Sequence, residues 1–337
     1  MIRIPNYLNV FRLTYKRTTQ TIIFKNQNFT TTTKSNPIQW KLTNSTSPPR
    51  YDTGCTFCQP NLPSDKPINF KQPLSKSSVI PDKHILSLTT TPSNDISNFN
   101  SKIEEIPGTL AHRIHGLKSE KQIGLKFGIT LSSIVLENHQ NILEKYGVKE
   151  SNDQLVFIYP DMKIVKFPTK DIDQFLKKYD LIEDQSKQEV YNPFKTVKDL
   201  TIQHKTNPID DIKIKDSNFK EFPIEKDLIV TCGHAKRDIR CGQLGPLITN
   251  EFNKVLKEKN LKDNTYLGQI SHIGGHAFAG NVLYYPKETQ STNDFIWYGR
   301  VFPQDVQSLV DDTVIDKKII KNLYRGDLEK IEKLACK

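Results

Sequence analysis

Two short stretches of the sequence concentrate residues that bind transition metals. The stretch TCGHAKRDIRCGQLGP contains Cys232 and Cys241. The stretch SHIGGHAFAGN contains His272 and His276. The whole chain has only five cysteines and eight histidines. Thiolates and imidazoles are ligands of zinc and of iron–sulfur clusters, so the two stretches together predict a metal centre.

Zinc is one candidate for this centre. Structural zinc sites commonly pair their ligands at C-x2-4-C and H-x3-5-H spacing. The H-x3-H pair fits that rule, whereas the C-x8-C pair is too widely spaced for a zinc knuckle. A single zinc ion whose two sulfurs come from one long loop stays open.

A [2Fe–2S] cluster fits the spacing better, because a two-iron core spans more space and accepts ligands from a wide loop. Such clusters bind thiolates, and in Rieske centres two histidines replace two cysteines. A centre with two thiolates in place of four is less negative, so we expect a reduction potential above that of all-cysteine ferredoxins. Lys236, Arg237 and Arg240 in the loop, with the N-terminus of the following helix, further favour the reduced state.

His234 lies in a ligand-like sequence pattern, but the rest of the sequence does not support it as a ligand. Cys232-Gly-His234 has the C-x-H pattern of a Rieske box, but Rieske proteins use two boxes and this sequence has no second one. We therefore expect His234 beside the centre or at the surface, and not among the ligands.

A separate C-x2-C pair, Cys55 and Cys58, lies in the segment GCTFCQP. A thioredoxin active site places such a pair between a strand and a helix N-terminus, where the thiolate is stabilised. Here no strand precedes the pair, and Pro60 and Pro63 follow it. An unreactive pair, a redox-active or regulatory disulfide, and half of a metal site all stay open.

The segments around the four candidate ligands alternate between strand and helix patterns. Apolar runs predict strands at DLIVTCG (227–233), TYLGQISHI (265–273), NVLYYP (281–286) and DFIWYGRV (294–301). Apolar stripes predict helices over 303–315 and over 246–260, where Pro246 suits the first turn and Cys241 lies just ahead of it. This β-α-β-β-β-α order is close to the thioredoxin-like plan. It brings the four side chains to one edge of the domain.

An earlier block shows a similar alternation, with strands predicted at 84–90, 126–135 and 154–167 and a helix at 171–182. The fold class predicted is therefore α/β, with a thioredoxin-like C-terminal domain and a second α/β domain before it; a thioredoxin-related architecture for that domain stays open. The expected boundaries are 1–45 for a leader, 46–64 for a cysteine-containing linker, 65–185 for the N-terminal domain, 186–214 for a second linker and 215–337 for the C-terminal domain.

The net charge of +10 belongs mainly to the leader. The first fifty residues hold eight of the 48 basic residues and no acidic residue, so the rest has 40 basic against 38 acidic residues, or about +2. Because nucleic-acid-binding domains usually have a basic face, we expect no nucleic-acid partner. No stretch reaches the roughly 18 to 20 apolar residues of a membrane helix, so we expect no membrane insertion.

The leader is also rich in hydroxyl residues and mixes apolar with basic side chains. These features are typical of a mitochondrial transit peptide. We therefore expect a mitochondrial protein that interacts with the import machinery, with the matrix favoured over the intermembrane space.

Three segments, TCGHAKRDIRCGQLGPLI, SHIGGHAFAGNVLYYP and WYGRVFPQDV, together resemble the sucrase/ferredoxin-like family of fungi and plants. The resemblance is strongest over residues 227–305 and general over the first block. It implies a C-terminal thioredoxin-like ferredoxin domain whose [2Fe–2S] cluster has two Cys and two His ligands, which here are Cys232, Cys241, His272 and His276. The "sucrase" in the family name has no support, because no carboxylate pair lies in a recognisable glycosidase context.

The sequence therefore predicts a mitochondrial electron carrier that takes part in redox homeostasis and exchanges electrons with an unidentified donor and acceptor protein. Two alternatives stay open. One is a thiol–disulfide oxidoreductase that uses Cys55 and Cys58, or Cys232 and Cys241. The other is a zinc-stabilised interaction module with no redox role.

Overall fold

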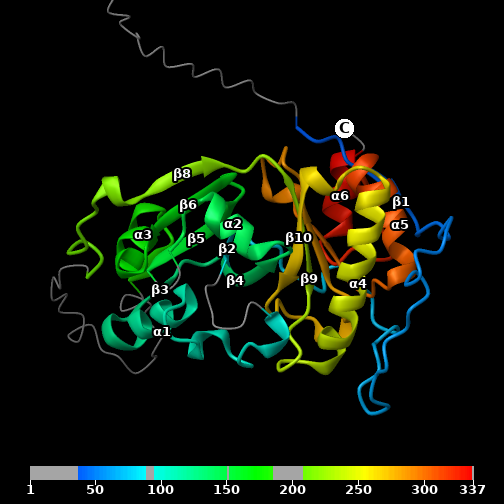
Figure 1. The fold of residues 1–337 in the computed structure, drawn as a ribbon, viewed down its shortest axis with the longest axis horizontal. Helices are drawn as coiled ribbons and strands as arrows, with labels where there is room; N and C mark the ends of the chain where they lie inside the picture. Colours follow the sequence, from blue (N-terminus) through cyan, green and yellow to red (C-terminus); the bar gives the residue numbers. More distant parts are fainter. Residues whose placement is uncertain (1–36, 89–94, 150–151, 185–207, 336–337) are drawn as a thin grey trace, which may run out of the picture. The chain divides into compact units, whose positions relative to one another are not determined.

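The fold comes from a computed structural model, which describes residues 37–88, 95–149, 152–184 and 208–335 (Figure 1). Most of the predicted leader, and the predicted linker up to residue 207, lie outside the described residues. None of the helices in the described ranges is both long enough and apolar enough to cross a membrane.

Nine strands form one mixed sheet in the order β12-β11-β9-β10-β4-β2-β5-β6-β8. Its C-terminal half consists of β9 (Asp227–Cys232), β10 (Thr265–Ile270), β11 (Val282–Tyr285) and β12 (Ile296–Tyr298). β10 runs parallel to β9 after the crossover helix α4 (Ile239–Glu258), whereas β11 is antiparallel to β9 and β12 to β11. This is the strand order of a thioredoxin-like domain, as the sequence predicts.

The N-terminal half of the sheet repeats the arrangement. Its strands are β2 (Lys83–Leu88), β4 (Ile129–Leu136), β5 (Asp153–Tyr159) and β6 (Lys163–Pro168). β4 runs parallel to β2 after the crossover helix α1 (Leu110–Lys121), and β5 and β6 follow antiparallel on the other side of β2. The α/β class is therefore confirmed, and both halves have the same strand order.

The two halves join at β4 and β10, which pair antiparallel with Ile134 opposite Ile270. The strands assigned to two predicted domains thus share one sheet (Figure 1). β8 (Lys220–Pro223) falls within the predicted C-terminal domain but pairs with β6 of the N-terminal half.

Shorter elements complete the fold. They are β1 (Lys41–Thr43), β3 (Ile123–Leu125), α2 (His139–Lys145), α3 (Ile172–Lys178), β7 (Ile182–Asp184), α5 (Val306–Ser308) with a following π-helical turn (Leu309–Ile315), β13 (Lys318–Ile320) and α6 (Leu328–Ala335). β1 pairs with β13, so residues 37–45, which the sequence analysis placed in the leader, belong to the folded unit. A three-residue strand that pairs near the other end of the chain has too short an apolar pattern to be recognised from sequence.

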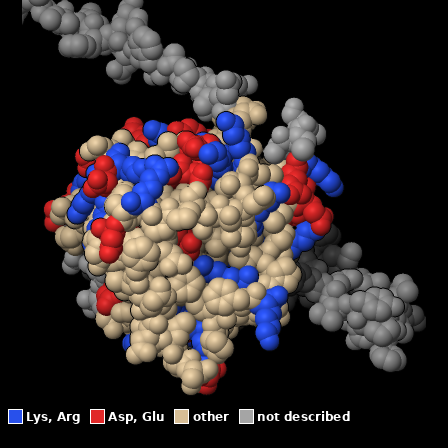
Figure 2. Space-filling view, turned by 90° about the vertical axis from the view of Figure 1, so that its right-hand side faces the viewer, with Lys and Arg blue, Asp and Glu red and all other residues tan. Residues whose placement is uncertain are grey.

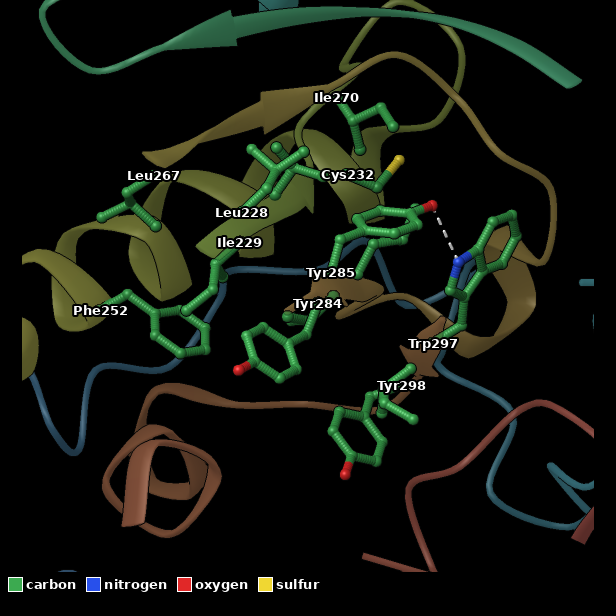
Figure 3. Close-up of a cluster of buried hydrophobic side chains, with 14 of the residues drawn as sticks. Leu228, Ile229, Cys232, Phe252, Leu267, Ile270, Tyr284, Tyr285, Trp297 and Tyr298 are labelled. Carbon is green, nitrogen blue, oxygen red and sulfur yellow. Dashed lines mark hydrogen bonds between the residues drawn. The ribbon is translucent and has the colours of Figure 1, made fainter. Parts of the chain in front are cut away.

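Buried aromatic side chains fill the space around the end of β9 (Figure 3). The Trp297 indole N–H donates to the Tyr285 hydroxyl at 3.1 Å, and that hydroxyl lies 2.6 Å from Nδ1 of His84. Burial lowers the pKa of His84 to about 3, so its ring is neutral. Trp297 and Tyr298 both lie in the core.

Surface charges of both signs are mixed on the face shown in Figure 2, where Lys and Arg lie next to Asp and Glu along the rim. Ion pairs such as Lys259–Asp311 and Lys318–Asp316 join opposite charges elsewhere along the chain. Basic and acidic residues are neighbours along the upper rim of the face in Figure 2.

Helix α4 begins at Ile239, seven positions earlier than the predicted start at Pro246. The Asp238 side chain caps the helix by accepting the Arg240 backbone N–H at 3.0 Å. Pro246 therefore lies inside the helix, and Cys241 lies in its first turn instead of ahead of it. The prediction was wrong because proline favours a first turn, and because the two glycines before it weaken a helical pattern.

Gly245 serves close packing of α4 against the end of β9. A Cβ at this position would lie 2.6 Å from the Cys232 carbonyl oxygen and 2.7 Å from the Cα of Gly233. Both are backbone atoms, so a side chain at Gly245 would push the helix away from the strand end that carries Cys232.

We predict that Gly245→Ala lowers the free energy of unfolding by about 1–3 kcal/mol, because the added methyl overpacks a rigid backbone contact. Gly116→Ala is the matched control. Gly116 lies in α1, where a Cβ would meet no atom closer than 3.5 Å, so alanine should stabilise by about 0.5–1 kcal/mol. Urea unfolding followed by circular dichroism measures both. Equal effects of the two substitutions would contradict the packing role of Gly245.

Candidate metal centre

Cys232 and Cys241 meet where β9 ends and α4 begins. Both side chains are buried, and both thiols are free. His272 follows β10, which pairs with β9 so that Ile270 lies opposite Cys232. One ligand atom from each of Cys232, Cys241 and His272 lies within 4.8 Å of the others. The structure therefore brings together three of the four side chains that the sequence predicts as ligands.

His276 lies beside this group but not within it. The ring centroids of His272 and His276 are 5.5 Å apart, and the His276 side chain is exposed. The chain between them turns through Gly274 and Gly275, which have φ of +83° and +72°. Such left-handed conformations favour glycine, so both residues serve the backbone turn between the two histidines.

His234 holds the two loops together. The His272 backbone N–H donates to its Nδ1 at 3.2 Å, so the ring proton belongs on Nε2, which lies 2.8 Å from the Asn100 carbonyl oxygen. Burial lowers the pKa of His234 and keeps the ring neutral. Because both nitrogens are engaged, His234 is placed beside the centre, as the sequence analysis expects, and it is buried.

The two sulfurs compete for one proton. The pKa of Cys232 lies well below its usual value, chiefly because the Cys241 thiol donates a hydrogen bond to it. The same hydrogen bond, together with burial, raises the pKa of Cys241. A metal would replace the shared proton and let both sulfurs ionise, since thiolates are the species that bind metals.

His272 adds a second sign of an incomplete site. Its Nδ1 is buried and has no hydrogen-bond partner among the described residues. Buried polar atoms are normally satisfied, so such an atom requires an explanation. Two buried sulfurs and a neighbouring imidazole with an unpaired nitrogen form a donor set that fits a thiophilic metal ion or an iron–sulfur cluster.

The cations of the Cys loop are either paired with an acidic neighbour or exposed. The Arg240 guanidinium forms a two-point ion pair with Asp238, with Nε–Oδ1 and Nη2–Oδ2 distances both 2.9 Å. Its charge is therefore largely cancelled. Lys236 and Arg237 are exposed, where water and salt screen their charges.

Cys55 and Cys58 belong to a different part of the fold. They lie in a turn in which the Cys58 N–H donates to the Cys55 carbonyl at 3.0 Å. The neighbouring Thr56 hydroxyl donates to the Glu251 carboxylate at 2.8 Å. Glu251 is ten residues beyond Cys241 in α4, or about 15 Å along the helix axis. The C-x2-C pair is therefore remote from the Cys–Cys–His group.

Fold and site together define an α/β protein that carries a buried Cys–Cys–His group on a thioredoxin-like sheet. The chain belongs to the sucrase/ferredoxin-like family, whose model matches residues 74–326. The family expectation is thus confirmed. No solved structure matches the chain.

Several fungal relatives share one name, altered inheritance of mitochondria protein 32. The protein from Meyerozyma guilliermondii is 39% identical over 280 residues, which cover 82% of this chain and 92% of the relative. The one from Debaryomyces hansenii is 41% identical over 270 residues, which cover 79% of this chain and 90% of the relative. The protein from Saccharomyces cerevisiae is 30% identical over 217 residues, which cover 63% of this chain and 66% of the relative.

We predict that a maleimide at pH 7 labels Cys58 in the native protein much faster than Cys55. Cys55 is only 6% exposed, and burial raises its pKa to about 11. At pH 7 about one such thiol in 10,000 is ionised, and only the thiolate reacts. Cys58 is half-buried. Peptide mapping by mass spectrometry distinguishes the two sites, and equal labelling would contradict this environment for Cys55.

Proposed function

We propose that this chain is a mitochondrial [2Fe–2S] electron-transfer protein whose cluster is held by Cys232, Cys241, His272 and His276. The observation that carries the proposal is the convergence of two buried cysteines and His272, with its unpaired Nδ1, beside a second histidine. When bound, such a cluster supplies reversible one-electron transfer.

The spread of the four side chains favours a two-iron cluster over zinc. A structural zinc ion holds all four ligands around one centre. Here three side chains gather closely, whereas His276 lies outside that group. This spread, together with family membership, supports the [2Fe–2S] assignment.

The proposed site has a buried side, formed by the cysteines, and a solvent-exposed side, formed by His276. Cys232 and Cys241 are buried, which keeps water from the thiolates. His276 is exposed, and a small pocket lined by His234, Arg237, His272 and residues 101–104 opens nearby. An unidentified donor and acceptor protein would therefore approach from the histidine side, where the path to the cluster is shortest.

The mitochondrial location is supported by two independent features. The relatives carry the word mitochondria in their name. The leader of this chain is basic and free of acidic residues, as in a transit peptide. Because a basic presequence favours import into the matrix, the proposed location is the matrix and not the intermembrane space.

The dithiol alternatives have less support. An attacking thiol in an oxidoreductase has a lowered pKa and is accessible. In the first pair only Cys58 is accessible, and its partner Cys55 is buried with a raised pKa; in the second pair Cys232 and Cys241 are both buried.

We expect Cys241→Ser to lose most of the iron and visible absorption in the purified protein, because a neutral serine hydroxyl is a much poorer iron ligand than a thiolate. Cys55→Ser is the matched control, and it should keep both iron and colour. Iron analysis and an absorption spectrum of each variant measure this. Loss of colour in Cys55→Ser, or retention of colour in Cys241→Ser, would contradict the assigned ligands.

We further expect His276→Cys to retain iron and to lower the reduction potential. The substitution replaces a neutral ligand by a negative one, which makes addition of an electron harder. A redox titration followed by electron paramagnetic resonance gives the potential. An unchanged or higher value would show that His276 is not a ligand or that the charge argument fails.

A further inference from the structure

Arg325 is a buried cation without an acidic partner. Its side chain is 1% exposed. The guanidinium donates to Oδ1 of Asn281 at 2.8 Å, to the Gly274 carbonyl at 3.3 Å, and to the carbonyl and hydroxyl of Ser77 at 3.2 and 3.3 Å. All of these acceptors are neutral.

Other arginines in the described part of the chain are either paired with a carboxylate or less buried than Arg325. Arg113 and Arg240 each pair with an aspartate. Arg300 donates only to backbone carbonyls, but it is half-buried, whereas Arg325 is fully buried. A buried charge is costly unless an opposite charge compensates it. None of the ion pairs among the described residues involves Arg325, so its counter-charge has to come from another source.

The position of Arg325 identifies that source. The Asn281 side chain accepts a hydrogen bond from the guanidinium. The backbone carbonyl of the same residue accepts the Cys232 backbone N–H at 2.9 Å. The Gly274 carbonyl, a second acceptor, lies in the turn between His272 and His276. One guanidinium thus touches both the residue that anchors Cys232 and the loop that carries the histidines.

The histidine loop is shaped around this cation. A Cβ at Gly275 would lie 2.1 Å from Nη2 of Arg325 and 2.6 Å from its Cζ. Only the absence of a side chain at Gly275 leaves room for the guanidinium. The Phe278 ring, from the same loop, lies 5.9 Å from Cζ of Arg325 and adds a cation–π contact.

We propose that Arg325 is the buried counter-charge of the reduced metal centre, where its positive charge offsets the net negative charge that the centre gains with one electron and so raises the reduction potential. The inference rests on the proposed [2Fe–2S] function. Arg325 does not bind the metal; it acts on the centre through space and positions the two loops.

The protonation of Arg325 agrees with this role. Burial lowers its pKa to about 10, while the nearby Cys232 and Cys241 charges favour the protonated form. Arg325 is therefore charged at neutral pH. Arg325, far downstream in the chain, thus adds to the role that the sequence analysis assigns to Arg240 and the exposed loop cations.

The test is a redox titration, followed by electron paramagnetic resonance, of purified wild type, Arg325→Gln and Arg325→Lys. We expect Arg325→Gln to bind iron as the wild type does. Its equilibrium constant for one-electron reduction should be about tenfold smaller, which corresponds to a reduction potential about 59 mV lower. Arg325→Lys keeps the charge and should retain most of the wild-type potential. An iron-loaded Arg325→Gln protein with the wild-type potential would overturn the inference.

Asn281→Asp keeps the inference testable if Arg325→Gln does not fold. The substitution preserves side-chain size and the contact to Arg325 but adds a carboxylate that neutralises the guanidinium. We expect Asn281→Asp to have a lower reduction potential than wild type. Lys236→Gln, in the exposed part of the Cys loop, is the control and should change the potential little. An unchanged potential in Asn281→Asp would overturn the inference. Wild type without iron would instead overturn the proposed function, and this inference with it.

Discussion

The contact between the end of β9 and the first turn of α4 is the constraint on which the site depends. Gly245 lets the helix approach the Cys232 carbonyl so closely that no side chain fits between them. The approach brings Cys241 against Cys232. The parallel pairing of β9 with β10 then places His272 on the same edge, two residues beyond Ile270. A thioredoxin-like sheet thus carries the Cys–Cys–His group through one close helix–strand contact.

Burial of this group creates an electrostatic problem that the surrounding chain addresses. Two sulfurs in a dry environment share a proton when no metal is present, since two adjacent thiolates repel and burial disfavours charge. His234 stays neutral, joins the two loops through Nδ1 and holds the Asn100 carbonyl through Nε2. Arg325 places a positive charge behind the site. The neutral and charged neighbours thus have separate roles, one in geometry and one in charge.

Much of this was predictable from sequence, because the relevant signals are local. Apolar runs located β9, β10, β11 and β12, and the ligand types at C-x8-C and H-x3-H spacing located the site. The start of α4 was missed because Pro246 and the preceding glycines resemble a helix boundary. Those glycines are explained by packing against the Cys loop, a contact that the sequence does not display.

Two other features depend wholly on tertiary contacts. β1 is a strand only because it pairs with β13 near the other end of the chain. Arg325 has no motif around it, and its relation to Cys232 passes through Asn281. The sheet that joins the two halves was also beyond reach, because edge pairing between β4 and β10 leaves no distinctive pattern in either strand.

The most direct test of the account is metal analysis of the anaerobically purified full chain, combined with visible absorption and electron paramagnetic resonance after reduction. The account predicts two irons per chain, visible absorption, and a Rieske-like signal in the reduced protein, as expected for a [2Fe–2S] centre with histidine ligands. One zinc per chain with no visible absorption would contradict it. That result would identify the Cys–Cys–His group as a structural zinc site.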